Sequence, residues 1–341
     1  MRKIFLVVIG LLAVAYIVFS FAELKSILAV LRQSKPLYLG VAIVVEAVLL
    51  LNTTATFLAI YRLVELRESG PRLFLMVTAA TFVNLVTPFS GIGGMAVFID
   101  EARRRSLSTG RVLVAGVLYI LYEYVALFAA LGVGFAVLAH LGKLNVAELL
   151  AAGFVVLLAG SIGTMLMVGY HSTRQLDNLL AWLARGANRL LRPFLHKEYI
   201  QIASVDTFSN EMTDGLASLR VANPGQILLP LVFTLINKLL LILVLALAFM
   251  ALGIPVNGEI VVAGFSIGHL FVYASPTPSG IGFVDSILPV ALHSLDVPLP
   301  SAVLVSLVYR AITLWLPLVL GALAFRSLQQ SRMRVISGGQ R

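Results

Sequence analysis

The chain has 341 residues, of which 60% are hydrophobic and only 12% are charged. Its mean hydropathy is +0.99. A soluble domain of this length does not hide so much apolar side chain, and charged residues normally make up about a quarter of such a domain. The composition excludes a soluble enzyme, a secreted disulfide scaffold and a disordered protein, and it predicts an all-α polytopic membrane protein. The sequence contains no cysteine, which excludes disulfides and cysteine-ligated metals.

Six apolar segments are long enough to cross a bilayer, because a membrane-spanning helix needs about 20 residues. They are residues 4–21, 37–61, 111–140, 147–170, 226–252 and 299–325. The first has the position of a signal peptide, but the charged residues Glu23 and Lys25 follow it in place of a small-residue cleavage site. We therefore predict six spanning helices.

Two further apolar segments, residues 73–100 and 259–293, are interrupted by proline and glycine. The interruptions read TPFSGIGG from Thr87 and SPTPSGIG from Ser275. Lipid cannot satisfy the backbone groups that such a break releases, so the break must be buried in protein or line a wet cavity. Both segments are predicted to be re-entrant helical hairpins, which enter the membrane and leave it on the same side.

The basic residues predict the orientation. With the N-terminus in the cytoplasm, the inner segments carry 19 of the 25 lysines and arginines. This bias requires residues 73–100 to return to their starting side, because a full crossing would separate the arginines of 62–72 from those of 103–111. We expect a multi-pass protein of the cytoplasmic membrane with both termini in the cytoplasm. The net charge of +9 is then an orientation signal, and no nucleic-acid partner is expected.

The two interruptions share the sequence SGIG, at Ser90 and again 189 residues later at Ser279. A polar turn follows each copy, and then a span with a central charge, Glu123 in one case and Arg310 in the other. Because the predicted hairpins open from opposite sides, we predict an inverted repeat, an architecture in which transporters place their site between the halves.

A single membrane domain is expected, and its parts follow from this repeat. The halves are residues 37–170 and 226–325. Residues 171–225 combine leucines at helical spacing with arginines, which predicts a cytoplasmic amphipathic linker that either recruits anionic lipid or simply joins the halves. Residues 326–341 are predicted to form a basic, frayed cytoplasmic tail.

Charged side chains inside the predicted membrane segments mark the candidate site, because a charge at mid-bilayer costs at least about 2.5–3.5 kcal/mol. They are Glu46, Glu123, Lys238, Asp285 and Arg310, with His269 as a titratable neighbour. We expect Glu123 and Arg310 to line a central cavity, where Arg310 holds a phosphate through its planar fork. Asp285 is expected to meet an ammonium group or Lys238. The alternative is that these charges only lock helices together.

The glycines of the interruptions are further candidates. A helix that begins just after a glycine-rich break directs free N–H groups at the cavity, which suits a phosphate. Gly93, Gly94, Ser279, Gly280 and Gly282 occupy such positions. Alternatively, these residues only permit close packing of helices.

In these residues the chain resembles the transmembrane, flippase-like region of the lysylphosphatidylglycerol synthase/flippase family. The first half of the signature is Asn84, Pro88, Gly93-Gly94, the arginines 103–105 and Glu123, and the second half is residues 278–282, Asp285, Arg310 and Trp315. Ser279 and Asp285 replace the usual Gly and Glu, and Ala96, Val97 and Phe98 stand where an Arg is usual. The resemblance implies a substrate site at the signature residues, and Lys238 is a further candidate because its charge lies inside a predicted span.

The resemblance also implies the function and the partners. The chain ends 16 residues after Phe325, so we expect the lipid-translocating part without the synthase domain. The expected partners are anionic or aminoacylated membrane phospholipids, and a separate lipid-modifying enzyme and a homo-oligomer are left open.

Enzymatic chemistry is not expected. The sequence has neither a GxxxxGK[ST] phosphate loop nor an HExxH zinc motif, so no cofactor and no metal are predicted. The favoured function is therefore a lipid translocator. The alternatives are a secondary transporter of a small anionic solute and a membrane enzyme acting on lipid-linked sugars, for which Asp100-Glu101 would supply an acidic motif.

Overall fold

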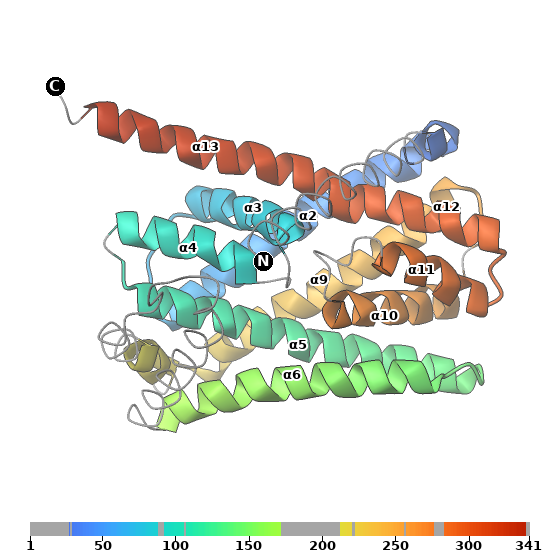
Figure 1. The fold of residues 1–341 in the computed structure, drawn as a ribbon, viewed down its shortest axis with the longest axis horizontal. Coiled ribbons are helices and arrows are strands. Elements are labelled where there is room, and N and C mark those ends of the chain that lie inside the picture. Colours follow the sequence, from blue (N-terminus) through green and yellow to red (C-terminus); the bar gives the residue numbers. More distant parts are fainter. Residues whose placement is uncertain are drawn as a thin grey trace, which may run out of the picture.

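The computed structural model describes residues 27, 29–87, 92–105, 107–171, 212–219, 222–255, 257–275 and 283–338. Within these ranges the chain is helical and has no strand (Figure 1). The helices are α2 (Pro36–Leu63), α3 (Gly70–Val86), α4 (Ile92–Arg104), α5 (Thr109–His140), α6 (Val146–His171), α9 (Pro224–Ala251), α10 (Gly258–Ala274), α11 (Phe283–Ser294), α12 (Leu299–Arg310), the π-helical turn η2 (Ala311–Trp315) and α13 (Leu316–Gly338).

Five helical stretches of the described chain are long and apolar enough to cross a membrane. They are α2, α5, α6, α9 and the continuous Leu299–Gln330, and they match five of the six predicted spans. The predicted span at residues 4–21 lies outside the described residues. Helix α6 exposes Leu150 at 70% and Leu157 at 74%. Water would solvate such a surface poorly, whereas lipid covers it, so the chain is an all-α multi-pass membrane protein.

The interrupted segments form two pairs of short helices in the described chain, α3 with α4 and α10 with α11. They contain 12 to 17 residues each. At 1.5 Å per residue such helices are about 18–26 Å long, less than the roughly 30 Å of a hydrocarbon core. Glu68, before α3, bonds Arg105, after α4, and Gly264 of α10 contacts Leu292 of α11. Each pair therefore begins and ends on one side, as the hairpin prediction requires.

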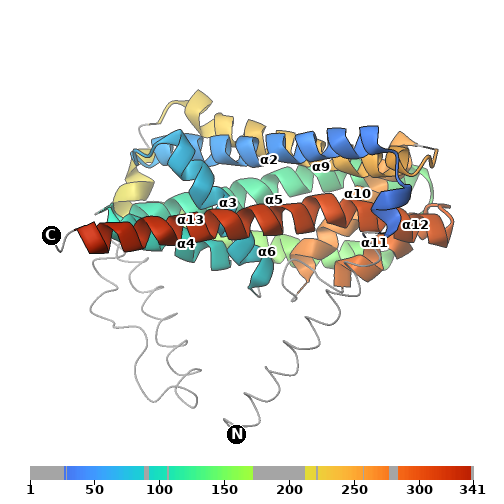
Figure 2. The same cartoon turned by 90° about the horizontal axis from the view of Figure 1, so that it is seen from above.

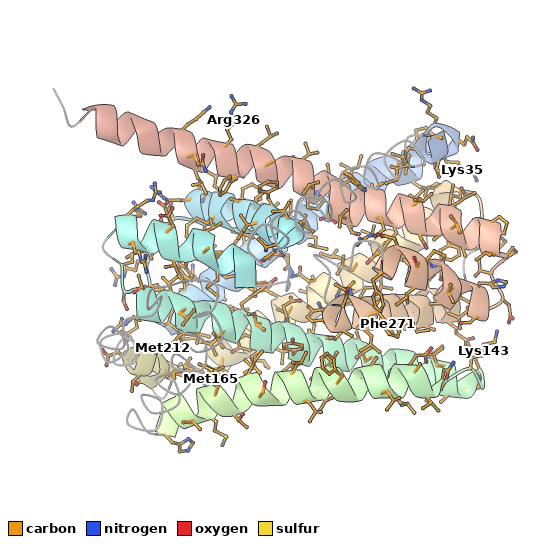
Figure 3. All side chains as sticks on the ribbon, viewed as in Figure 1. Lys35, Lys143, Met165, Met212, Phe271 and Arg326 are labelled. Atoms are coloured by element: carbon orange, nitrogen blue, oxygen red, sulfur yellow. The ribbon has the colours of Figure 1, made fainter. Side chains whose placement is uncertain are left out.

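The two pairs occupy opposite halves of the molecule, and the ends of α3 and α10 face the middle (Figure 1). Lys35 and Lys143, both predicted to lie outside the cell, share one end of the molecule (Figure 3). Met212, from the predicted cytoplasmic linker, lies at the other end. Re-entry into a membrane and the orientation stay predictions. The positions of Lys35 and Lys143 at one end and of Met212 at the other agree with the predicted orientation.

The two predicted halves contact each other reciprocally. Helix α2 packs antiparallel along α9 (Figure 2), while α3 packs on α13 and α10 packs on α5. One glycine lies where α3 crosses α13, and another lies where α10 crosses α5. A Cβ on Gly321 would stand 2.6 Å from Cβ of Phe82, and one on Gly134 would collide with the side chain of Ser266. Gly321 follows Gly134 by 187 residues, the interval that also separates Arg310 from Glu123.

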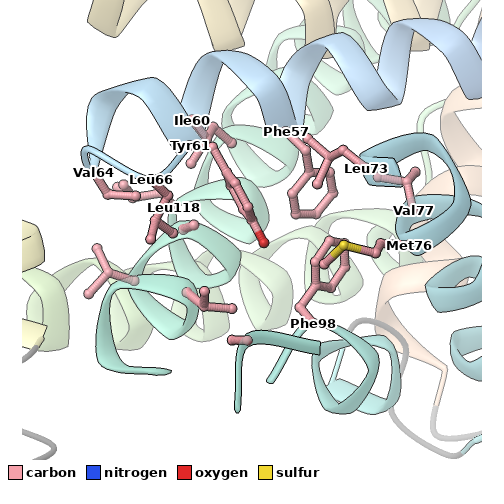
Figure 4. Packing of buried hydrophobic residues seen from close by; sticks show 14 of the residues in the cluster. Phe57, Ile60, Tyr61, Val64, Leu66, Leu73, Met76, Val77, Phe98 and Leu118 are labelled. Carbon is pink, nitrogen blue, oxygen red and sulfur yellow. The ribbon is translucent and has the colours of Figure 1, made fainter. Parts of the chain in front are cut away.

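The first half has its own apolar core where α2, α3, α4 and α5 meet (Figure 4). Phe57 of α2 stacks on Phe98 of α4 with ring centroids 4.7 Å apart, and on Tyr119 of α5 at 4.4 Å. Met212 and Leu216, in the helical residues 212–219, pack into this core. The end of the predicted linker is therefore docked against the first half. Its other part, residues 172–211 and 220–221, lies outside the described residues.

The C-terminal helix differs from its prediction in two ways. The π-helical turn Ala311–Trp315 begins directly after Arg310, within the predicted span 299–325. Helix α13 then continues to Gly338, so the predicted tail is helical rather than frayed over most of its length. The residues between Gly321 and Gly338 include neither glycine nor proline, and leucine, glutamine, arginine and methionine favour helix.

Arginines and carboxylates hold the outer ends of α3 and α4 together. Nη1 of Arg105 lies 2.7 Å from both carboxylate oxygens of Glu68, and Arg72 of α3 pairs with Glu101 of α4. Burial tends to raise the pKa of Glu68. The hydrogen bonds from Arg105 and from the backbone of Ser69, with the charges of Arg105 and Arg72, outweigh burial and lower this pKa below its ordinary value.

We predict that the crossing glycines limit stability. Gly321→Ala should lower the free energy of unfolding by about 1–3 kcal/mol, because the added methyl group meets the backbone carbonyl of Thr78 and Cβ of Phe82, which cannot swing away. The control is Gly132→Ala on α5, where nothing lies within 4 Å of the added atom. Thermal unfolding in detergent measures both, and equal melting temperatures would contradict the proposed close crossing.

We predict a pH-dependent contribution from Glu68. Because its pKa is lowered in the folded state, the carboxylate stabilises the fold above its ordinary pKa, and this stabilisation disappears as the pH falls through the lowered value. Glu68→Gln should therefore lower stability by about 0.2–1 kcal/mol at neutral pH and by nothing in acid. Glu65→Gln, which removes the longer contact of 3.4 Å to Arg111, is the control. A deficit of Glu68→Gln that persists at low pH would refute this assignment.

Candidate functional site

Two buried ion pairs lie in the interior of the described chain. Lys238 of α9 donates from Nζ to Oε2 of Glu123 on α5 at 2.6 Å. Arg310, the last residue of α12, has Nε 2.5 Å from Oδ1 of Asp285 on α11. Lys238 and Arg310 are 3% and 6% exposed. The four charges predicted to meet in the membrane are thus neutralised pairwise, which removes most of the cost of placing them there.

The partners differ from the expected ones. Asp285 pairs with Arg310 rather than with Lys238, because Glu123 already occupies the ammonium group of Lys238. Glu123 and Arg310 occupy matching positions of the predicted repeat, but each bonds a residue of the second half.

Helix α10 contributes two polar side chains around Lys238. The hydroxyl of Tyr273 donates to Oε2 of Glu123 at 2.9 Å, and Nε2 of His269 lies 3.2 Å from Nζ of Lys238. If the imidazole ring of His269 carries its proton on Nδ1, its Nε2 accepts a hydrogen bond from Nζ of Lys238. The sequence marked His269 only as a titratable neighbour and gave no role to Tyr273. Their spacing of four residues, which places both on one helix face, was the available signal.

A cavity of about 200 Å³ lies between the second helix pair, α9, α12, η2 and the end of α3. Its polar wall residues are His269, Tyr309, Arg310 and Thr313, and the others are apolar or glycine. We call it the central cavity. Glu123 is not part of its wall, and it reaches the cavity only through Lys238 and His269. The π-helical turn follows Arg310 directly, and such turns occur frequently at functional sites.

Another cavity, of about 280 Å³, lies between α3, α4 and α13. We call it the outer cavity. Its apolar wall residues are Val83, Ala96, Val97, Phe325 and Leu328, and Asp100, Glu101, Arg104 and Gln329 complete it. Asp100 pairs with Arg104 at 2.7 Å, and Glu101 pairs with Arg72. Both carboxylates of the acidic motif are therefore bound by arginine.

The first interruption uses its glycines for packing. Oδ1 of Asn84 on α3 accepts the N–H of Gly94 at 2.5 Å, and a Cβ on Gly94 would lie 2.8 Å from the carbonyl oxygen of Ala80. A Cβ on Gly93 would collide with Thr87. The expectation of a free N–H at Gly94 is thus wrong, because Asn84 occupies it. Ser279, Gly280 and Gly282 lie outside the described residues.

An amide contact between α2 and α9 was not anticipated. Nδ2 of Asn52 donates to Oδ1 of Asn237 and to the carbonyl of Phe233, both at 2.7 Å, and Asn237 donates to Thr53 at 3.2 Å. Hydrogen bonds between helices stabilise their association within lipid, where apolar contact alone gives little preference. Two asparagines in the middle of apolar spans were the sequence signal for this contact.

A comparison with known protein families gives a match over residues 4–321, to the family described as "Lysylphosphatidylglycerol synthase TM region". The chain belongs to this family. No curated protein matches it. The match spans both predicted halves and confirms the family resemblance drawn from Asn84 through Trp315. The family description refers to a synthase, but the matched part is its transmembrane region.

We predict that the pair of Glu123 and Lys238 is a strong stabilising contact that needs both members. Glu123→Gln or Lys238→Met should each lower the free energy of unfolding by about 3–5 kcal/mol, because either change leaves a buried polar partner uncompensated. The double variant Glu123→Leu with Lys238→Met should recover most of this loss. The exposed Glu259→Gln is the control. Single variants as stable as the native protein would show that the pair contributes nothing to the fold.

Proposed function

We propose that this protein is a lipid translocator, which moves a phospholipid or lipid-linked head group between the leaflets of the cytoplasmic membrane without acting as an enzyme. The observation that carries the proposal is the position of Arg310. Its guanidinium group is buried beside Asp285 in the wall of an otherwise largely apolar cavity between the ends of the interrupted helices. A charged contact surrounded by apolar walls suits an amphiphile, whose phosphate and acyl chains need both environments.

The relation of the two cavities supports a lipid over a small solute. Val83 lines the outer cavity and Leu85 the central cavity, so both cavities border α3 within one helical turn. The continuous helical stretch Leu299–Gln330 also borders both, through Phe325 of α13 and Leu314 of η2. Charged residues lie in the wall of the outer cavity, at Asp100, Glu101 and Arg104, and most of the other residues that line the two cavities are apolar. An anionic solute would gain nothing from these apolar walls, whereas acyl chains would.

The ion pair of Arg310 explains how an anion can be exchanged. While the site is empty, Asp285 neutralises the guanidinium group, which spares the cost of an isolated buried charge. A lipid phosphate then takes over one side of the planar fork. Since the family signature places Asp285 just after the second interruption, this exchange would act directly on the helix pair that we propose to be re-entrant.

Reconstitution tests the proposal. Liposomes that contain the purified protein and head-group-labelled fluorescent phospholipids of several classes should show accelerated exchange between leaflets for at least one class. Arg310→Ala should slow this exchange by about 10- to 100-fold, the equivalent of losing one charge-assisted hydrogen bond of about 1.5–3 kcal/mol. Arg310→Lys keeps the charge without the fork and should give an intermediate rate.

The matched control is Arg326→Ala, an exposed arginine of α13. Each variant must first elute from size-exclusion chromatography as folded protein. Native protein that accelerates exchange of no phospholipid class would refute the translocator. In that case, uptake of a labelled organic anion into sealed liposomes would favour the solute transporter, which shares the architecture.

A further inference from the structure

Glu46 is a deeply buried acid that the proposed mechanism does not use. It lies in the middle of α2 and is 2% exposed. Its Oε2 is inaccessible and has no hydrogen-bond partner in the described chain, and no ion pair of the described residues includes Glu46. In this respect it differs from Glu123 and Asp285, which pair with Lys238 and Arg310, respectively.

The basic groups on the helices that contact α2 are engaged elsewhere or exposed. Lys238 of α9 pairs with Glu123, and Arg310, directly before η2, pairs with Asp285. Arg72 of α3 pairs with Glu101, and Arg111 of α5 pairs with Glu65. Arg62, on α2 itself, is exposed. Tyr309 is a titratable side chain that interacts electrostatically with Glu46. Tyr309 also lines the central cavity.

An unpaired carboxylate is not stable in this setting. Its ionised form would cost at least about 2.5–3.5 kcal/mol at mid-bilayer depth. A metal ion would need several oxygen ligands, and the described residues contain no group of three or more His, Cys, Asp or Glu side chains that could hold one. A proton neutralises the group without further ligands. The packing of α2 against α9 and η2 in this structure therefore fits the neutral acid.

We propose that Glu46 is an intramembrane proton-binding site whose proton is exchanged through the central cavity, past Tyr309, in each transport cycle. The carboxylate takes up one proton from cavity water to become the neutral acid, and it later returns that proton to water on the other side. No other bond changes. The inference rests on the proposed translocator, and it names the ion whose movement accompanies the lipid.

The proton couples to the conformation through the contacts of α2. The neutral acid can stay sealed in the interior beneath the helices that pack on α2, whereas the carboxylate requires water. Releasing the proton therefore requires this packing to open toward the cavity. Because Arg310 immediately precedes η2, the same opening reaches the group that we propose to hold the lipid phosphate.

Two measurements test the proposal. Infrared difference spectroscopy of the full-length protein in detergent should show, at neutral pH, the carbonyl stretch of a protonated carboxylic acid that disappears in Glu46→Gln. In liposomes with a gradient of one pH unit, the native protein should concentrate labelled phospholipid in one leaflet relative to the other by up to about tenfold. This ratio is the equivalent of about 1.4 kcal/mol for one proton per lipid. Glu46→Gln, which mimics the neutral acid, should fold and give an even distribution.

Glu259→Gln is the matched control, since Glu259 is an exposed acid on α10, and it should keep both the band and the gradient response. Three results would each overturn the proposal. They are the absence of the band between pH 5 and 9, a gradient response that Glu46→Gln retains, and a response to sodium in place of protons. Native protein that shows the band but moves no lipid would instead refute the translocator and, with it, the coupling.

Discussion

The contact of Glu123 with Lys238 is the interaction on which the arrangement of the interior depends. It joins α5 of the first half to α9 of the second, and Tyr273 brings α10 into the same bond network. Neither charge could remain at this depth alone. The pair therefore fixes the rotation of α5 and α9 about their axes, since any other rotation would turn at least one charge toward apolar neighbours. The amides of Asn52 and Asn237 fix α2 against α9 in the same way.

The long helices and the interrupted helix pair of α3 and α4 are held by different kinds of contact. The long helices α2, α5 and α9 are joined in their middles by buried polar contacts. The pair of α3 and α4 is held at its outer end by Glu68, Glu101 and their arginines, while its inner end carries the cap that Asn84 provides for α4. The close crossing at Gly321 gives α3 a fixed surface along α13.

Much of this arrangement could be predicted from hydropathy and charge, because lipid imposes strict rules on both. Five spans and both helix pairs occur where apolar length and the Gly/Pro interruptions place them, and all of the predicted intramembrane charges within the described chain are buried or nearly so. Which acid pairs with which base was not predictable. The pairing depends on how each helix is rotated against its neighbours, and the spacing of charges along a single sequence does not determine that rotation. The π-helical turn after Arg310 has no sequence signature. Tyr273 and Asn52 were missed for another reason. Uncharged polar residues are common in spans, and the signals that these two gave, a four-residue spacing from His269 and a second asparagine in another span, name no partner.

The electrical neutrality of the interior limits which lipids the site can accept. Because the positive charge of Arg310 is already balanced by Asp285, a phosphate that displaces the carboxylate would leave Asp285 separated from its cation. That separation costs several kcal/mol unless the lipid also brings a positive group. A head group with both a phosphate and an ammonium could satisfy Arg310 and Asp285 together, whereas a purely anionic head group would have to be accompanied by a proton. We therefore expect the proposed translocator to prefer zwitterionic or aminoacylated phospholipids, because Glu46 is already neutral in this arrangement and its proton offsets no further negative charge.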